Sequence, residues 1–147
     1  MRILLISGPN LNNLGKRDPE QYGTQTLPDI EALVQKRAEE WQAEIRPYQS
    51  NHEGAMIDFI QQESSAEGMI INAGALTHYG LALRDAIADF PGLVVEVHLS
   101  NIFDREEFRH TSVTAPVASG LVSGLGWRGY LAALDALIGM LHEGAKS

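Results

Sequence analysis

The sequence predicts an α/β fold in which a parallel sheet carries helices on both faces. Short aliphatic runs alternate with amphipathic helical patterns along the whole chain, and this alternation is typical of parallel strands joined by crossover helices. The runs are apolar at consecutive positions, which favours strands that are buried on both faces. With 147 residues and 44% hydrophobic content, the chain can bury about two-thirds of its unfolded surface. We therefore expect one domain, spanning residues 1–147.

The first half of the chain is predicted to form two strands and two helices around a long loop. Four consecutive aliphatic residues, from Ile3 to Ile6, indicate a buried first strand. Residues 8–26 are rich in Gly, Pro and Asn without periodicity, and loops of this length inside a domain are usually functional. We expect the 8–26 loop to be a mobile lid over a ligand site. The predicted elements are a strand over 2–7, a helix over 28–41, a strand over 43–49 and a helix over 55–62.

The second half continues the alternation. Thr77 stands at the start of a helical pattern, where its hydroxyl suits an N-cap. The predicted elements are a strand over 68–72, a helix from Thr77 to about Phe90, a strand over 93–97 that stops at His98, a polar loop over 99–112, a strand over 113–122 and a helix over 125–142. Five strands in a chain of this length predict a flavodoxin-like three-layer sandwich with a five-stranded parallel sheet.

The composition excludes several classes of protein. The chain has no cysteine, which excludes disulfides, thiolate nucleophiles and thiolate metal sites and fits a cytoplasmic protein. No apolar run approaches the roughly 18 residues that a membrane span needs. Nineteen acidic and eleven basic residues give a net charge of −8 without a basic stripe, which disfavours a nucleic-acid partner. An anionic ligand would therefore need a local cluster of arginines.

Polar residues follow the predicted strands at one edge of the sheet. In an open parallel sheet, ligands bind outside the carboxyl ends of the strands. Asn10, Asn72 and His98 follow the first, third and fourth strands, and Ser50 and Asn51 follow the second. A structural histidine is the competing interpretation of His98. The convergence of amides and a histidine predicts a small-molecule site at this edge.

Other candidate motifs are weaker. The segment from Gly124 to Gly129 matches the G-x-G-x-x-G pattern, but residues 130–147 leave no room for a second strand with a ribose-binding acid. A tight turn into the last helix is the better interpretation. The five histidines lack the spacing of metal ligands, so we expect no metal.

Several charged and aromatic residues are candidates for binding. His78 and Asp85 are seven residues apart and would share a face of one helix. Arg17 and Tyr22 lie in the first predicted loop and Arg109 in the second. Solvated loop arginines are the competing interpretation of Arg17 and Arg109.

Six segments in order give the chain a specific resemblance to the type II 3-dehydroquinate dehydratases. Each segment alone is weak, but together they run collinearly from residue 3 to about residue 137 and cover essentially the whole chain. The segments are Gly8–Asn12 continued by Leu14–Pro19 and Tyr22–Gly23, Gln49–Gly54, Asn72–His78, Ala82–Ala86, Glu96–Asn101 and Arg105–His110.

The resemblance implies dehydration of 3-dehydroquinate to 3-dehydroshikimate through an enolate, without a cofactor. It implies that Tyr22 is the base, and that Arg17 stabilises the tyrosinate as a nearby cation does for any acid. Asn10 matches the asparagine that holds a water at the enolate oxygen, where pre-placed donors are needed. His98 matches the group that protonates the leaving hydroxyl, a task that imidazole can perform at neutral pH.

The resemblance also implies how the substrate is anchored and how the chain assembles. Asn72 and the backbone N–H groups of Leu99 and Ser100 are expected to bind the carboxylate, while His78 and Arg109 bind ring hydroxyls. Asp85 matches an aspartate that reaches a neighbouring subunit's site, which implies a homododecamer built as a tetramer of trimers.

Two alternatives use the same chain differently. The first is a catalytically silent, flavodoxin-like binding module, against which the joint presence of the site residues argues. The second is Schiff-base dehydration on a lysine, which needs a desolvated amine. Lys16 lies in a loop, Lys36 on a polar helix face and Lys146 near the terminus, so the sequence disfavours that route.

Overall fold

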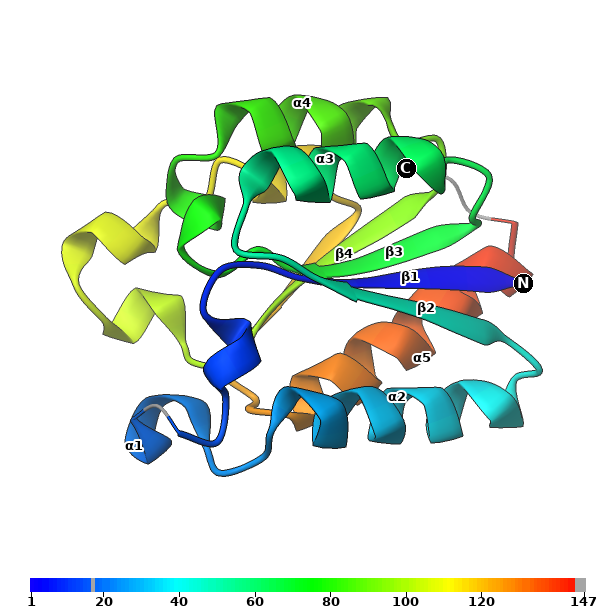
Figure 1. Ribbon diagram of the computed structural model, residues 1–147. Helices are drawn as coiled ribbons and strands as arrows, with labels where there is room; N and C mark the ends of the chain where they lie inside the picture. The colour runs from blue at the N-terminus through cyan, green and yellow to red at the C-terminus, as the bar shows by residue number, and fades with distance from the viewer. Residues whose placement is uncertain (17, 145–147) are drawn as a thin grey trace.

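A computed structural model describes residues 1–16 and 18–144, and its centre is a five-stranded sheet (Figure 1). All pairings are parallel, in the order β2-β1-β3-β4-β5, which confirms the predicted flavodoxin-like arrangement. The strands are β1 (Arg2–Ser7), β2 (Glu44–Gln49), β3 (Gly68–Asn72), β4 (Leu93–His98) and β5 (Gly120–Ser123).

Helices cover both faces of the sheet. In Figure 1, α3 (Glu53–Gln62) and α4 (Leu81–Asp89) lie above the sheet, and α2 (Leu27–Glu40) and α5 (Arg128–His142) lie below it. The helix α2 begins with a capping box, in which Thr26 and Asp29 bind each other's backbone N–H groups. The result is the expected three-layer sandwich.

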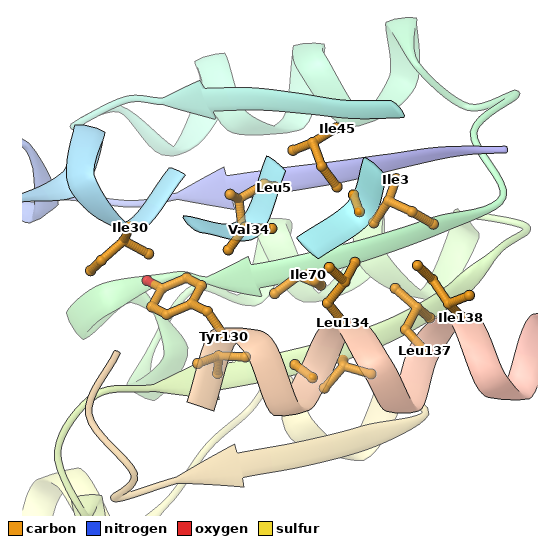
Figure 2. Packing of buried hydrophobic residues seen from close by; sticks show 14 of the residues in the cluster. Ile3, Leu5, Ile30, Val34, Ile45, Ile70, Tyr130, Leu134, Leu137 and Ile138 are labelled. Carbon is orange, nitrogen blue, oxygen red and sulfur yellow. The ribbon is translucent and has the colours of Figure 1, made fainter. Parts of the chain in front are cut away.

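Consecutive aliphatic residues are needed because the central strands face two hydrophobic layers. Side chains alternate between the faces of a strand, so Ile3 and Leu5 pack with α2 and α5 while Leu4 and Ile6 pack with α3 and α4. All four are completely buried. Figure 2 shows the first layer, in which the hydroxyl of Tyr130 points toward the carboxyl ends of the strands.

The fifth strand and the last helix are shorter than predicted. The segment expected to be a strand over 113–122 contains a 3₁₀ turn, η5 (Ala115–Val117), and pairs only from Gly120. Pro116 cannot donate a ladder hydrogen bond, and the hydroxyls of Ser112 and Thr114 bond to a side chain of β4. The helix expected from Leu125 begins at Arg128, after a turn through Gly126.

The prediction of Thr77 as an N-cap is wrong. Residues Gly74–His78 form a 3₁₀ turn, η2, and α4 begins only after Gly80. Thr77 is fully buried, and its hydroxyl lies 2.6 Å from that of Thr114. Consequently His78 and Asp85 are not on one continuous helix.

The two predicted loops contain short helices. Residues 8–26 include η1 (Leu11–Asn13) and α1 (Pro19–Tyr22), and residues 99–112 include η3 (Ile102–Asp104) and η4 (Glu107–His110). Leu11 and Leu14 are buried in the core, so the first part of the 8–26 segment is anchored. In Figure 1, α1 and the 102–110 turns lie at the same end of the sheet.

The described part of the chain contains neither a membrane-spanning helix nor a cluster of metal ligands. Among residues 1–16 and 18–144, no helix has the length and apolarity needed to cross a membrane. Within those same ranges, no three His, Asp or Glu side chains gather as metal ligands would.

Candidate active site

A cavity of about 120 Å³ opens at the carboxyl ends of the strands, and most of the predicted site residues line it. Its walls come from the loops after β1, β3 and β4, from α1 and from η4. Eight predicted residues take part, namely Asn10, Tyr22, Asn72, His78, His98, Leu99, Ser100 and Arg109. Segments far apart in the sequence therefore converge on one small polar space.

Two glycines allow the loops after β1 and β3 to touch. A Cβ added at Gly8 would lie 2.5 Å from the carbonyl oxygen of Ala73, and one at Gly74 would lie 3.0 Å from that of Pro9. Gly74 also has a positive φ of 60°, which other residues rarely adopt. This close approach brings Asn10 and Asn72 to the same cavity.

The loop that carries Asn10 is braced from β2. The backbone N–H of Asn10 donates to Asn51 Oδ1 at 3.0 Å, and Gln49 Nε2 donates to the carbonyl of Gly8 at 3.2 Å. Asn10 itself has a φ of 70°, a conformation that asparagine tolerates better than most residues. Asn51 therefore supports the site from behind, and neither Ser50 nor Asn51 is among the residues that line the cavity.

Asn72 is held at both ends of its amide group. Its Nδ2 donates to the hydroxyl of Tyr130 at 2.9 Å, and its Oδ1 accepts from the N–H of Gly74 at 3.1 Å. Burial raises the pKa of Tyr130 to about 12, so the phenol is neutral at pH 7. The Nδ2 group carries two N–H bonds and gives one to Tyr130, so Asn72 has one N–H left to donate into the cavity.

His98 is backed by a buried carboxylate. Its Nε2 lies 2.7 Å from Oε2 of Glu96, two residues earlier on β4. A carboxylate only accepts hydrogen bonds, so Nε2 carries the proton and Nδ1 is the ring nitrogen left for other partners. Burial opposes ionisation of Glu96, but hydrogen bonds from His98, Thr114 and Ser112 outweigh it and hold the pKa of Glu96 below its ordinary value. The pair is therefore a carboxylate–imidazole unit.

His78 presents a hydrogen-bond acceptor to the cavity. Its Nδ1 lies 2.7 Å from the carbonyl oxygen of Thr111, and a carbonyl only accepts, so Nδ1 carries the proton. Burial lowers the pKa of His78 below its ordinary value, although the hydrogen bond to Thr111 opposes the shift. At pH 7 the ring is neutral, and the lone pair on Nε2 can accept a hydrogen bond from a hydroxyl group.

Tyr22 lies beside a cation that the sequence analysis left without a role. The guanidinium carbon of Arg105 lies 5.3 Å from the centre of the Tyr22 ring, within the range of a cation–π interaction. Arg105 also lines the cavity and donates to Ser100 Oγ at 3.3 Å. Arg109 lines the cavity too, and its Nε is 3.2 Å from a carboxylate oxygen of Glu106. Together they supply the local positive charge that an acidic chain needs to hold an anion.

Asp85 does not line the cavity, and Arg17 cannot be compared with it. Asp85 lies on the exposed side of α4. Arg17 lies outside the described residues. Both predicted roles therefore stay predictions.

Glu96 and Arg105 are the functional candidates that the sequence analysis missed. Glu96 carries a readable signal, since it is the one charged residue of an aliphatic strand and shares a face with His98 two positions on. Arg105 carries none, because nothing in the 99–112 segment separates it from Arg109 before the chain is folded.

Comparisons with known proteins show the family of the chain. A family described as Dehydroquinase class II matches residues 1–138. A 3-dehydroquinate dehydratase from Roseiflexus castenholzii is 59% identical over 145 residues, which are 98% of this chain and 92% of the relative. The solved type II dehydroquinase from Butyrivibrio crossotus has a TM-score of 0.91 at 45% identity and covers 94% of this chain and 97% of its own. That from Propionibacterium acnes has a TM-score of 0.89 at 39% identity, with coverages of 92% and 94%. This chain belongs to the type II dehydroquinase family.

Proposed function

We propose that this chain catalyses the dehydration of 3-dehydroquinate to 3-dehydroshikimate through an enolate, without a cofactor. The observation that carries the proposal is the cavity itself. It combines a phenol beside a cation, a carboxylate-backed imidazole, a neutral histidine and a fixed amide. Family membership and the names of the relatives support the same reaction.

The first half of the reaction removes a proton alpha to the ketone. Tyr22 acts as the base, and the guanidinium of Arg105 lies 5.3 Å from the centre of its ring. Arg17 is assigned to stabilising the phenolate on the resemblance alone. The electron pair left by the proton makes an enolate, whose oxygen needs a pre-placed donor. A water held by Asn10 fills that role.

The second half expels the hydroxyl group beta to the ketone. The enolate re-forms its carbonyl, a carbon–carbon double bond forms, and the carbon–oxygen bond to the hydroxyl breaks. His98 gives this oxygen a proton so that it leaves as water. The ionised Glu96 at 2.7 Å stabilises the protonated imidazole before the transfer.

The other cavity residues anchor the substrate. The free N–H of Asn72, with the backbone N–H groups of Leu99 and Ser100, binds the carboxylate. Nε2 of His78 accepts from a ring hydroxyl, and Arg109 donates to another. These groups hold the ring still between Tyr22 and His98, which is the requirement for an acid and a base to act on one molecule.

A catalytically silent binding module is the alternative, and the Glu96–His98 pair argues against it. Binding a polyhydroxy acid needs hydrogen-bond donors and local positive charge, which Asn72 and the arginines supply. It does not need an ionised carboxylate buried behind a histidine, an arrangement whose desolvation is costly. Such a cost is typical of a site that moves protons.

Three further features complete the proposal, in which residues 1–147 act as one domain. The 8–26 segment closes over the cavity as a lid, since it carries Tyr22.

The subunits assemble as a homododecamer in which α4 delivers Asp85 to a neighbouring site. The side chains of Tyr79, Leu81 and Phe108, between 60% and 65% exposed, support a contact surface there. The enzyme works in the cytoplasm on a small-molecule substrate, without nucleic-acid or membrane partners.

The test is a direct absorbance assay with 3-dehydroquinate. The product is a conjugated enone and absorbs in the ultraviolet, where the substrate does not. Turnover should persist after treatment with EDTA and after borohydride reduction in the presence of substrate, which would trap a Schiff base. No signal at micromolar enzyme would contradict the proposed function, and loss of activity on borohydride treatment would contradict the mechanism.

A further inference from the structure

The carboxylate of Glu96 is surrounded by hydroxyl groups from outside its own strand. Thr114 donates to Oε1, and Ser112 donates to Oε2 at 2.9 Å. Thr77, from η2, lies 2.6 Å from the hydroxyl of Thr114. Glu96 and Thr77 are completely buried and Thr114 is 1% exposed. We call Thr77, Ser112 and Thr114 the hydroxyl cluster.

The direction of each hydrogen bond follows from counting protons. A hydroxyl group has one proton, and Thr114 and Ser112 both give theirs to Glu96. Thr77 is then left to donate, to Thr114 at 2.6 Å or to Ser112 at 3.2 Å, while the backbone N–H of Ala115 donates to Ser112 at 2.9 Å. Every proton points toward the carboxylate, which is the arrangement that suits an ionised Glu96.

The cluster has two consequences for His98. Bonds to both oxygens fix the carboxylate plane, and hence the imidazole that donates to Oε2. The same bonds share the negative charge among several donors, so the carboxylate attracts the imidazole proton less strongly. Glu96 with fewer donors would bind the Nε2 proton more tightly, which makes the imidazole more basic and its Nδ1 proton harder to release.

We propose that the hydroxyl cluster is a positioning element for the Glu96–His98 pair: it fixes Glu96 and weakens the pull of the carboxylate on the Nε2 proton, so that the protonated imidazole gives up its other proton, on Nδ1, more readily to the leaving hydroxyl. The inference rests on the proposed function for the delivery step only. The effect on the pair is a property of the folded chain and is measurable without substrate.

Other charged groups near the pair do not belong to the cluster. His98 lies on the same strand as Glu96, and His78 of η2 is close enough to sense the charges of Glu96, His98 and Arg109. The hydroxyl cluster contributes no titratable group of its own. Substituting its members therefore changes hydrogen bonding to Glu96 while leaving every nearby charge in place.

The first measurement is an NMR titration of the histidine side chains in the free protein, with His98 assigned from a His98→Gln spectrum. In Thr114→Val, which loses the hydroxyl and keeps the branched shape, the pair should take up its proton at a higher pH than in the wild type, by about half a unit to one unit. Thr114→Ser retains the hydroxyl and should titrate as the wild type does. Ser112→Ala is the second test and should shift in the same direction.

The second measurement is the pH dependence of turnover of 3-dehydroquinate. The basic limb of kcat should move to higher pH in Thr114→Val, and kcat should fall by about threefold to tenfold because a more basic pair is a weaker acid. KM should change less than twofold. Ser119→Ala is the control. It removes a hydroxyl that accepts from the N–H of Val94, which is on β4 like Glu96, so it should lower stability without changing the pH profile or kcat.

The outcomes separate the two proposals. A wild-type protein without dehydratase activity would end the proposed function, while the NMR shift would still decide the inference. The inference about the hydroxyl cluster would be overturned if the Glu96–His98 pair titrated as in the wild type in both Thr114→Val and Ser112→Ala. It would also be overturned if kcat had the same pH dependence in Thr114→Val as in Ser119→Ala.

Discussion

Replacing Glu96 with glutamine should remove most of the activity while leaving the fold intact. Glutamine has nearly the same shape, and its carbonyl oxygen can still accept the Nε2 proton of His98. What is lost is a negative charge 2.7 Å from the imidazole. An opposite charge at such a distance is worth about 1–3 units of proton affinity, and each unit is a factor of ten. The imidazolium that His98 must form before it protonates the leaving hydroxyl should therefore be about 10- to 1,000-fold less stabilised in Glu96→Gln.

The assay is kcat and KM for 3-dehydroquinate across pH, with thermal unfolding as the check on the fold. We expect Glu96→Gln to lose kcat by a factor in that range at neutral pH, with KM nearly unchanged, and to recover in part at acidic pH. Glu39→Gln is the matched control, because Glu39 is exposed on α2. A Glu96→Gln enzyme with the kcat of the wild type at every pH would refute the assignment of Glu96 as the partner of His98.

Three other predictions concern the lid, the assembly and His78. Trypsin should cut after Lys16 or Arg17 in the free enzyme and be blocked by a substrate analogue, and cutting at equal rates would count against a lid. Sedimentation should give a particle near twelve subunits, and Asp85→Ala should lose activity without changing that size; a fully active monomer would rule out a role across the interface. Because burial lowers the pKa of His78 from its ordinary value, analogue binding should weaken only as the pH falls through that lowered pKa, where Nε2 gains a proton and can no longer accept a hydrogen bond. His78→Gln should abolish that acid-side weakening.

The sequence predicted the sheet well where burial alone decides the structure. The runs in β1, β3 and β4 are apolar at nearly every position, since these strands face a hydrophobic layer on each side. Prediction failed where tertiary hydrogen bonds override local preference. Thr114 looks like a strand residue and Thr77 like a cap, yet both hydroxyls turn inward to the cluster around Glu96.

Part of the site could also be predicted from the sequence, namely the part that depends on where the strands end. Residues at or just beyond the carboxyl ends of strands, such as Asn10, Asn72 and His98, could be placed because those ends share one edge of a parallel sheet. The partnership of Arg105 with Tyr22 could not, since it depends on how two separate loops fold against each other. Glu96 could have been found from its period-two spacing to His98.

Replacement of Tyr22 with phenylalanine tests the central mechanistic claim most directly. The change removes the phenolic oxygen that accepts the substrate's proton and keeps the ring beside Arg105. The wild type and Tyr22→Phe are compared by their single-turnover rate, their steady-state kcat and the Kd of a substrate analogue. Tyr48→Phe is the control, because Tyr48 stacks on Phe59 outside the cavity. We predict that kcat for Tyr22→Phe falls by about 10²–10⁴-fold while the analogue's Kd changes little. Turnover by Tyr22→Phe close to that of the wild type would contradict the assignment of Tyr22 as the base.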